Sequence, residues 1–243
     1  MSGGRLLVFE SIAPVVFARG GSKGIPQKNL AIVGGKTLLR RSIEHGLAAG
    51  FSTVFVSTDS EEIAEEAGRA GGTVPFLRPS ELASDESPEW HSWQHFSSFL
   101  ADGYPGQFTH LLVLPTTAPL RAQEDLDAVL NLIISGAWDI VLTMTPAQRH
   151  PMFNMVRQGP QGQVSLYDGS SSAVSRRQDV ESVYDLTTVA YGAAIDFVLR
   201  ATNMWEGRTA GVIVPHERAI DIDTPFDVEF AEFLLGRKRA HGS

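Results

Sequence analysis

Short apolar runs alternate with amphipathic segments along most of the chain. The run IAPVVF at residues 12–17 is apolar throughout and ends at a glycine-rich loop, which is typical of a strand buried on both faces of a parallel sheet. Similar runs predict strands at residues 54–57, 73–77, 110–114, 140–144, 187–194 and 211–215. Helical spacing predicts helices at residues 38–49, 88–100, 124–135 and 225–235, and a further helix that is capped by Ser60 and carries Ile63 and Ala67. This order predicts an α/β fold with a Rossmann-like, mostly parallel sheet and helices on both faces.

The pattern breaks between Thr145 and Tyr184, where polar and glycine-rich stretches surround two short β-like pieces. We interpret residues 1–243 as a single domain with an inserted β-hairpin extension at residues 145–186. A projecting hairpin of this kind is commonly an arm that binds a second copy of the chain. We therefore expect a homodimer, with the extension serving dimerisation.

Composition narrows the function classes. The 243 residues, 43% of them apolar, are enough for one buried core, and no apolar run approaches the length that crosses a bilayer. We expect a soluble, cytoplasmic protein with no membrane partner. The chain has no cysteine, so any metal must be held by carboxylates or imidazoles. The net charge of -8 argues against a nucleic-acid partner.

The loop FARGGSKGIPQKN at residues 17–29 follows the first predicted strand and combines glycines with cations. Glycines allow backbone N–H groups to converge on an anion, and Arg19 and Lys23 can neutralise a triphosphate at the carboxyl end of the strand. The loop matches neither the P-loop nor the dinucleotide-binding spacing. The alternative is a surface turn that happens to be basic.

The segment IDIDTPFDVEFAE at residues 220–232 carries paired carboxylates. Asp221 and Asp223 are two residues apart in an extended segment, so they point to the same side and can share one hard cation. Mg²⁺ suits such a pair because it prefers oxygen ligands. The alternative is that Asp223 caps the following helix and Asp221 is solvated.

The stretch ARGGSKGIPQKN, residues 18–29, resembles the signature loop of the acylneuraminate cytidylyltransferases, the CMP-sialic acid synthetases. The Lys-Gly-Ile form of the loop leans toward nine-carbon sugars rather than octulosonates. The closing segment IDIDT resembles the family's last motif. The resemblance implies that the nucleotide is bound by Ala18, Arg19, Gly20, Gly21, Ser22, Lys23, Asn29, Arg78 and Ser87, with Lys28 also on the phosphates and Mg²⁺ at Asp221 and Asp223.

A third segment, RRQDVESVYDLTTVAY at residues 176–191, resembles the family's sugar-binding stretch. It implies that the acidic sugar is contacted by Arg176, Arg177, Gln178, Tyr184 and Thr187. Three stretches depart from the family, and one of them lies within this segment. Thr187-Thr188 replaces the usual Asn-Gly, Pro115 replaces a glutamine, and Pro88 and Glu89 stand where a base-contacting serine is expected.

The resemblance implies a cytidylyltransferase that moves CMP from CTP to the anomeric hydroxyl of a nine-carbon 2-keto-3-deoxy sugar acid and releases pyrophosphate. The catalytic set is Arg19, Lys23, Lys28, Asp221 and Asp223. Alternatives are a relative that uses another nucleoside triphosphate or an octulosonic acid, a non-catalytic nucleotide sensor, and a glycosyltransferase that consumes an activated sugar. His91 and His95, and the serines at 170–172, are interpreted as structural.

Overall fold

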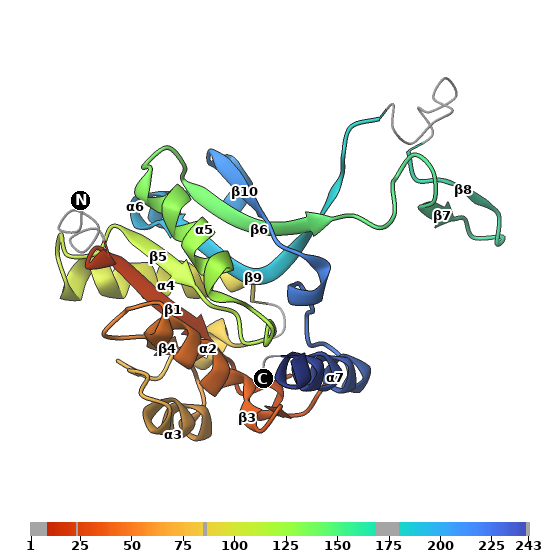
Figure 1. Ribbon diagram of the computed structural model, residues 1–243. Helices are drawn as coiled ribbons and strands as arrows, with labels where there is room; N and C mark the ends of the chain where they lie inside the picture. Colours follow the sequence, from red (N-terminus) through yellow and green to blue (C-terminus); the bar gives the residue numbers. More distant parts are fainter. Residues whose placement is uncertain (1–8, 23, 85–86, 169–179, 242–243) are drawn as a thin grey trace.

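A six-stranded sheet forms the centre of the computed structural model, which describes residues 9–22, 24–84, 87–168 and 180–241 (Figure 1). The strand order is β10-β6-β9-β5-β1-β4. These strands are β1 (Ile12–Phe17), β4 (Phe55–Ser57), β5 (His110–Val113), β6 (Ile140–Pro146), β9 (Tyr184–Ala194) and β10 (Thr209–Ile213). β1 runs parallel to β4 and β5, and β10 runs parallel to β6, whereas β9 is antiparallel to both neighbours. The predicted mostly parallel sheet is confirmed.

Helices cover both faces of this sheet, as predicted. One face carries α2 (Leu38–Ala48), α3 (Glu61–Arg69) and α5 (Gln123–Ile134), and the other carries α4 (Glu89–Gly103) and α6 (Ile195–Arg200). The alternation of strand side chains divides the core accordingly. Ile12 and Val16 of β1 join the first core cluster, while Ala13 and Val15 join the aromatic cluster around α4.

Helix ends follow local sequence signals. The Ser60 side chain accepts a hydrogen bond from the backbone N–H of Ile63, so Ser60 caps α3 as predicted. Gly50, with φ of 99°, follows α2 and terminates it. The strand predicted at residues 73–77 is wrong: only Thr73 and Leu77 make isolated bridges to the β4 edge. Pro75 lies between them and has no N–H to donate to a ladder.

The last helix, α7 (Pro225–His241), packs on a small hairpin formed by β2 (Ile32–Val33) and β3 (Lys36–Thr37). Val33, Leu38, Ile222 and Ala231 form a third buried cluster at this contact. Burial of Ile222 brings the IDIDT turn against the loop that follows β1. Short 3-10 helices complete the described elements at η1 (Lys28–Leu30), η2 (Ser80–Leu82), η5 (Met204–Glu206) and η6 (His216–Arg218).

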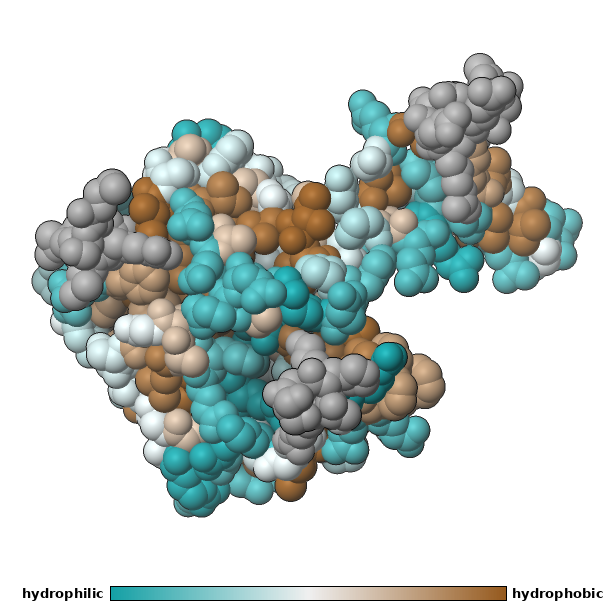
Figure 2. Space-filling view, viewed as in Figure 1, coloured by the Kyte–Doolittle hydropathy of each residue, from teal (hydrophilic) through white to brown (hydrophobic). Residues whose placement is uncertain are grey.

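A second hairpin, β7 (Val156–Gln158) and β8 (Val164–Leu166), projects from the body of the molecule within the predicted extension (Figure 1). Figure 2 shows hydrophobic side chains on this hairpin. The register pairs Val156 with Leu166 and Gln158 with Val164, which puts these three apolar side chains on one face. The exposed fraction is 58% for Val156, 36% for Leu166 and 64% for Val164. Among the described helices, none is long and apolar enough to span a bilayer.

Candidate active site

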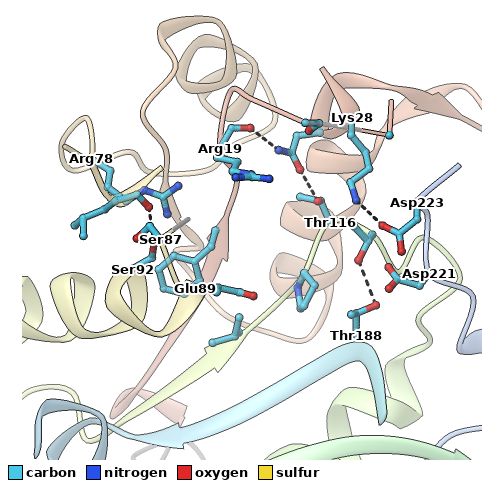
Figure 3. Close-up of a pocket in the computed structure, with 18 of the residues that line it drawn as sticks. Arg19, Lys28, Arg78, Ser87, Glu89, Ser92, Thr116, Thr188, Asp221 and Asp223 are labelled. Carbon is cyan, nitrogen blue, oxygen red and sulfur yellow. Dashed lines mark hydrogen bonds and ion pairs between the residues drawn. The ribbon is translucent and has the colours of Figure 1, made fainter. Parts of the chain in front are cut away.

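A cavity of about 520 Å³ lies at the carboxyl ends of β1 and β5 (Figure 3). The chain leaves β1 toward β4 on one side and later returns as β5 on the other side, so the cavity sits where the strand order reverses. This is the usual position of ligand sites in open α/β sheets. Its lining comprises Phe17, Arg19, Ser22, Gly24, Lys28, Asn29, Arg78, Leu82, Ser84, Ser87, Glu89, Ser92, Val113, Pro115, Thr116, Thr117, Thr188, Tyr191, Asp221 and Asp223.

One end of the cavity joins the basic loop to the paired aspartates. Lys28 Nζ lies 2.9 Å from Asp223 Oδ1 (Figure 3). A Cβ at Gly24 would overlap the carbonyl oxygen of Asp223, so the loop lies directly on the IDIDT backbone. Only glycine permits that approach. Lys28 and Asp223 are separated by 195 positions in the chain, yet they form one charged wall of the cavity.

Asp221 occupies a partly buried position on the same wall. Its Oδ1 atom is buried and has no hydrogen-bond partner among the described residues. Burial raises the pKa of Asp221, and the negative charge of Asp223 adds to the rise, while the hydroxyls of Thr117 and Thr188 oppose it. The carboxylate of Asp221 is therefore held in the cavity at an electrostatic cost.

The capping alternative for these aspartates is wrong. Thr224 and Asp227 cap α7: Asp227 Oδ2 accepts from the backbone N–H of Thr224 at 2.7 Å, and Thr224 Oγ1 accepts from that of Asp227 at 3.4 Å. Asp221 is half-buried, and its Oδ1 is shielded from solvent. The two carboxylates, one with an unpartnered buried oxygen, fit a Mg²⁺ ion that completes its shell with water and phosphate oxygens. The described residues contain no cluster of three or more metal-ligating side chains.

The other end of the cavity gathers Arg78, Ser87, Glu89 and Ser92 (Figure 3). Arg78 is only 5% exposed, and its Nε has no partner among the described residues. Burial lowers the pKa of Arg78, against the attraction of Asp59 and Glu89. The Glu89 side chain is reached by solvent through the cavity, but the surrounding walls exclude enough water to raise its pKa.

Asn29 connects two loops of the cavity instead of standing free in it. Its Nδ2 donates to the carbonyl oxygen of Arg19 at 2.8 Å, and its Oδ1 accepts from Thr116 Oγ1 at 2.6 Å. Asn29 therefore fixes the basic loop relative to the Thr116-Thr117 stretch that follows β5.

Buried charged side chains stabilise the Thr116-Thr117 stretch from the side that faces away from the cavity. Arg121 donates to the carbonyl oxygens of Val189 and Pro115, and burial lowers its pKa to about 9. Arg218 forms a bidentate ion pair with Asp125, in which Nε lies 2.9 Å from Oδ2 and Nη2 lies 2.8 Å from Oδ1. Because Arg218 lies two residues before Ile220, the first residue of the IDIDT segment, this pair anchors the aspartate turn to α5.

The residues predicted from sequence fall into three groups. Those that line the cavity are Arg19, Ser22, Lys28, Asn29, Arg78, Ser87, Asp221 and Asp223. Those that do not line it are Ala18, Gly20, Gly21, Tyr184 and Thr187. Lys23, Arg176, Arg177 and Gln178 lie outside the described residues.

Thr187 differs most from its predicted place. It is buried, and its Oγ1 donates to Thr143 Oγ1 at 2.8 Å. Successive strand residues point to opposite faces, so Thr188 turns to the cavity instead, and its Oγ1 accepts from Thr117 Oγ1 at 3.2 Å. The pairing of β6 with β9 shifts register next to Thr143, a feature that strand patterning does not reveal.

The fold and the cavity together define a nucleotidyltransferase of the Rossmann-like α/β type. A family model described as "Cytidylyltransferase" matches residues 13–89. The chain is 31% identical to the "Post-translational flagellin modification protein B" of Campylobacter coli over 92% of this chain and 94% of that protein. The chain therefore belongs to the cytidylyltransferase family, in the group that handles sialic-type acids.

Two further comparisons agree. The chain is 29% identical to the "Pseudaminic acid cytidylyltransferase" of Campylobacter jejuni subsp. jejuni, over 90% of this chain and 94% of the relative. A solved structure of "CMP:2-keto-3-deoxy-manno-octonic acid synthetase complexed with CTP" has a TM-score of 0.68 at 17% identity and covers 94% of this chain and 99% of its own. At that identity the likeness shows the shared fold.

Proposed function

We propose that this protein transfers CMP from CTP to the anomeric hydroxyl of a nine-carbon 2-keto-3-deoxy sugar acid and releases pyrophosphate. The observation that carries the proposal is the single cavity in which the basic loop meets Asp221 and Asp223. The names of two relatives, a "Pseudaminic acid cytidylyltransferase" and a "CMP-N,N'-diacetyllegionaminic acid synthase", support the nucleotide and the acidic sugar. Since CTP is a cytoplasmic metabolite, we expect the protein to act in the cytoplasm.

The chemistry requires the sugar oxygen, the α-phosphorus and the leaving oxygen to lie in line. The sugar oxygen bonds to the α-phosphorus, the bond from that phosphorus to the pyrophosphate oxygen breaks, and the hydroxyl proton passes to solvent. No covalent enzyme intermediate is needed, so the protein contributes positioning and charge stabilisation. Arg19, Lys23 and Lys28 would face the phosphates, Ser22 and the glycines would form the loop around them, and Asn29 would hold that loop in place.

Asp221 and Asp223 would hold Mg²⁺ between the turn and the phosphates. When bound, the ion would neutralise charge on the triphosphate. Lys28 pairs with Asp223 in the described structure and would then turn to the phosphates as well. Asp221→Ala is expected to abolish turnover while leaving the fold intact.

For the sugar, we propose contacts from Thr117 and Thr188, which line the cavity beside Asp221. Arg176, Arg177 and Gln178 stay predictions for the sugar carboxylate and hydroxyls, as does Tyr184 at the start of β9. Thr187 would act indirectly, because its hydroxyl already bonds Thr143 and steadies the strand that carries Thr188.

We also propose that the protein is a homodimer joined through its projecting hairpin. An isolated two-stranded hairpin is marginal in water, and this one carries an exposed apolar face of Val156, Val164 and Leu166. Burial of that face against a second copy would stabilise both the arm and the dimer.

The test is pyrophosphate release with CTP, Mg²⁺ and a panel of eight- and nine-carbon keto-deoxy acids. Asp221→Ala serves as the blank, and Asp102→Ala, an exposed aspartate on α4, serves as the matched control. Release with a nine-carbon acid and CTP is expected for the wild type and the control. Tight CTP binding with no release from any sugar would instead indicate a nucleotide sensor, and release with another triphosphate would indicate a different transferase.

A further inference from the structure

The two ends of the cavity differ in charge and hydrogen-bonding character. Lys28, Asp221, Asp223 and Thr188 gather at one end, and Arg78, Ser87, Glu89 and Ser92 gather at the other (Figure 3). A nucleoside triphosphate laid across the cavity places its phosphates at the basic loop and the aspartate turn. Its base then falls at the Arg78 and Glu89 end.

We propose that Glu89 accepts a hydrogen bond from the exocyclic amino group of cytosine and so determines the preference for CTP over UTP. The inference rests on the proposed function and deepens it. Cytosine carries an amino donor at position 4 beside two acceptors, whereas uracil carries a carbonyl at position 4 and an N–H at position 3. A carboxylate that faces position 4 accepts a hydrogen bond from the amino group of cytosine and repels the carbonyl oxygen of uracil.

Arg78 supplies the complementary donor at this end. Its guanidinium has donors only, it is almost fully buried, and its Nε has no partner among the described residues. A buried donor without a partner costs free energy unless a ligand satisfies it. Arg78 therefore offers a donor for the acceptors N3 and O2 of cytosine, and Glu89 offers an acceptor for its amino group, at the same end of the cavity.

Glu89 lies in the first turn of α4, where a negative charge favours the helix, and this role leaves most of its hydrogen-bonding capacity unused. Among the described residues, its side chain accepts one hydrogen bond, from Trp93 Nε1 to Oε1 at 3.2 Å, one helical turn further along α4. An ionised carboxylate has about four acceptor sites, so most of its capacity is open to a ligand. Among the described residues lining the cavity, it is the sole carboxylate outside the Asp221 and Asp223 turn. Burial raises the pKa of Glu89, so the cavity destabilises the charged form of this carboxylate. Such carboxylates are typical of functional sites.

The size of the effect follows from the loss of a hydrogen bond in a water-poor site. Sites built to bond an N–H or O–H group reject analogues lacking it by roughly 10⁴-fold in the strongest cases. Glu89→Gln keeps the length of the side chain and an oxygen for Trp93, but its amide can turn an N–H toward the carbonyl of uracil. We expect the CTP-to-UTP ratio of kcat/KM to fall by at least ~10-fold in this variant.

The experiment measures dissociation constants of CTP and UTP without sugar, and pyrophosphate release with each nucleotide, for the wild type and Glu89→Gln. Glu81→Gln, an exposed glutamate on η2 outside the cavity lining, is the matched control and should keep the wild-type ratio. A fall in the ratio for Glu89→Gln, with CTP still bound, supports the inference.

The outcomes separate the two proposals. If the wild type prefers CTP and Glu89→Gln keeps the same ratio, the assignment of Glu89 is overturned and the proposed function stands. If the wild type binds no CTP, both the proposed function and the assignment of Glu89 are overturned. A wild type that binds CTP and UTP equally also overturns the assignment.

Discussion

Carboxylates with opposite pKa shifts lie in different parts of the molecule. Hydrogen bonds from Arg208 lower the pKa of Asp139, which stabilises the charged form on the surface. Burial instead raises the pKa of Glu89 and Asp221, and both line the cavity. Groups that lose solvation without gaining a cation are typical of functional sites.

The raised pKa of Glu89 predicts a pH-dependent cost in stability. The native state binds the Glu89 proton more tightly than the unfolded chain does, so this group lowers stability as pH rises from its unfolded pKa, about 4.3, through its native pKa. Glu89→Gln removes that cost. We expect its Tm to exceed that of the wild type at pH 8 and to match it at pH 4. Thermal melts at the two pH values check this, and a lower Tm for the variant at both would show that Glu89 stabilises the fold.

Asp125 and Glu124 offer a matched pair because both contact Arg218. Asp125 is 3% exposed and bidentate, whereas the Glu124 side chain is 68% exposed. Removal of the buried Asp125 leaves Arg218 with the exposed Glu124 as its remaining ion-pair partner, so Asp125→Ala should lower the free energy of unfolding by about 3 kcal/mol. Glu124→Ala should cost less than about 1 kcal/mol. Urea unfolding of both variants provides the measurement, and equal losses would contradict the anchoring role.

At the scale of elements, the site depends on the contact between the basic loop and the IDIDT turn. Gly24 allows that contact, and a Cβ there would overlap the carbonyl oxygen of Asp223. Gly24→Ala should therefore separate Lys28 from Asp223 and reduce kcat/KM at least ~10-fold, since small displacements from the reactive geometry cost that much or more. Pyrophosphate release gives the readout.

Gly21→Ala is the control for this prediction, because a Cβ at residue 21 meets no atom within 4 Å and neither glycine has a positive φ. It should keep most of its activity. Equal loss in the two variants would mean that glycine is needed for the conformation of the loop and not for its approach to Asp223.

Local signals predicted the elements well and the cavity in part. The apolar run at β1 and the Ser60 cap are contained within a few residues, so sequence patterns report them directly. Pro75 is a sequence signal against the strand predicted at residues 73–77, since proline has no N–H for a ladder, although the residues around it are apolar. Thr188 depends on the register between β6 and β9, and register is set by pairing of distant strands.

Glu89 illustrates what motif comparison leaves out. The sequence placed it at a position where the family has a serine, which marks a departure without assigning a role. Only the packing of α4 beside β1 and β5 brings its side chain into the cavity. A departure from a motif is informative once the fold shows what the new side chain faces.

At the scale of the whole molecule, the hairpin predicts the oligomeric state. Val164→Lys puts a charge on the apolar face proposed to meet a second copy, and a buried unpaired charge is strongly unfavourable. We expect the wild type to sediment as a dimer and this variant as a monomer in analytical ultracentrifugation. Ser165→Lys lies on the opposite face of β8 and should remain dimeric. A dimeric Val164→Lys variant would place the interface elsewhere.

The position of β9 in the sheet bears on how the chain is made. β9 separates β5 from β6 and pairs with both, yet it is synthesised after the whole hairpin extension. Until Tyr184–Ala194 leaves the ribosome, β5 and β6 have unpaired edges in the growing chain, and such edges favour association with other chains. The aspartate turn emerges later still. Chains whose synthesis is arrested before β9 should therefore aggregate. Nucleotide binding should arise only in chains in which β9 has already paired with β5 and β6.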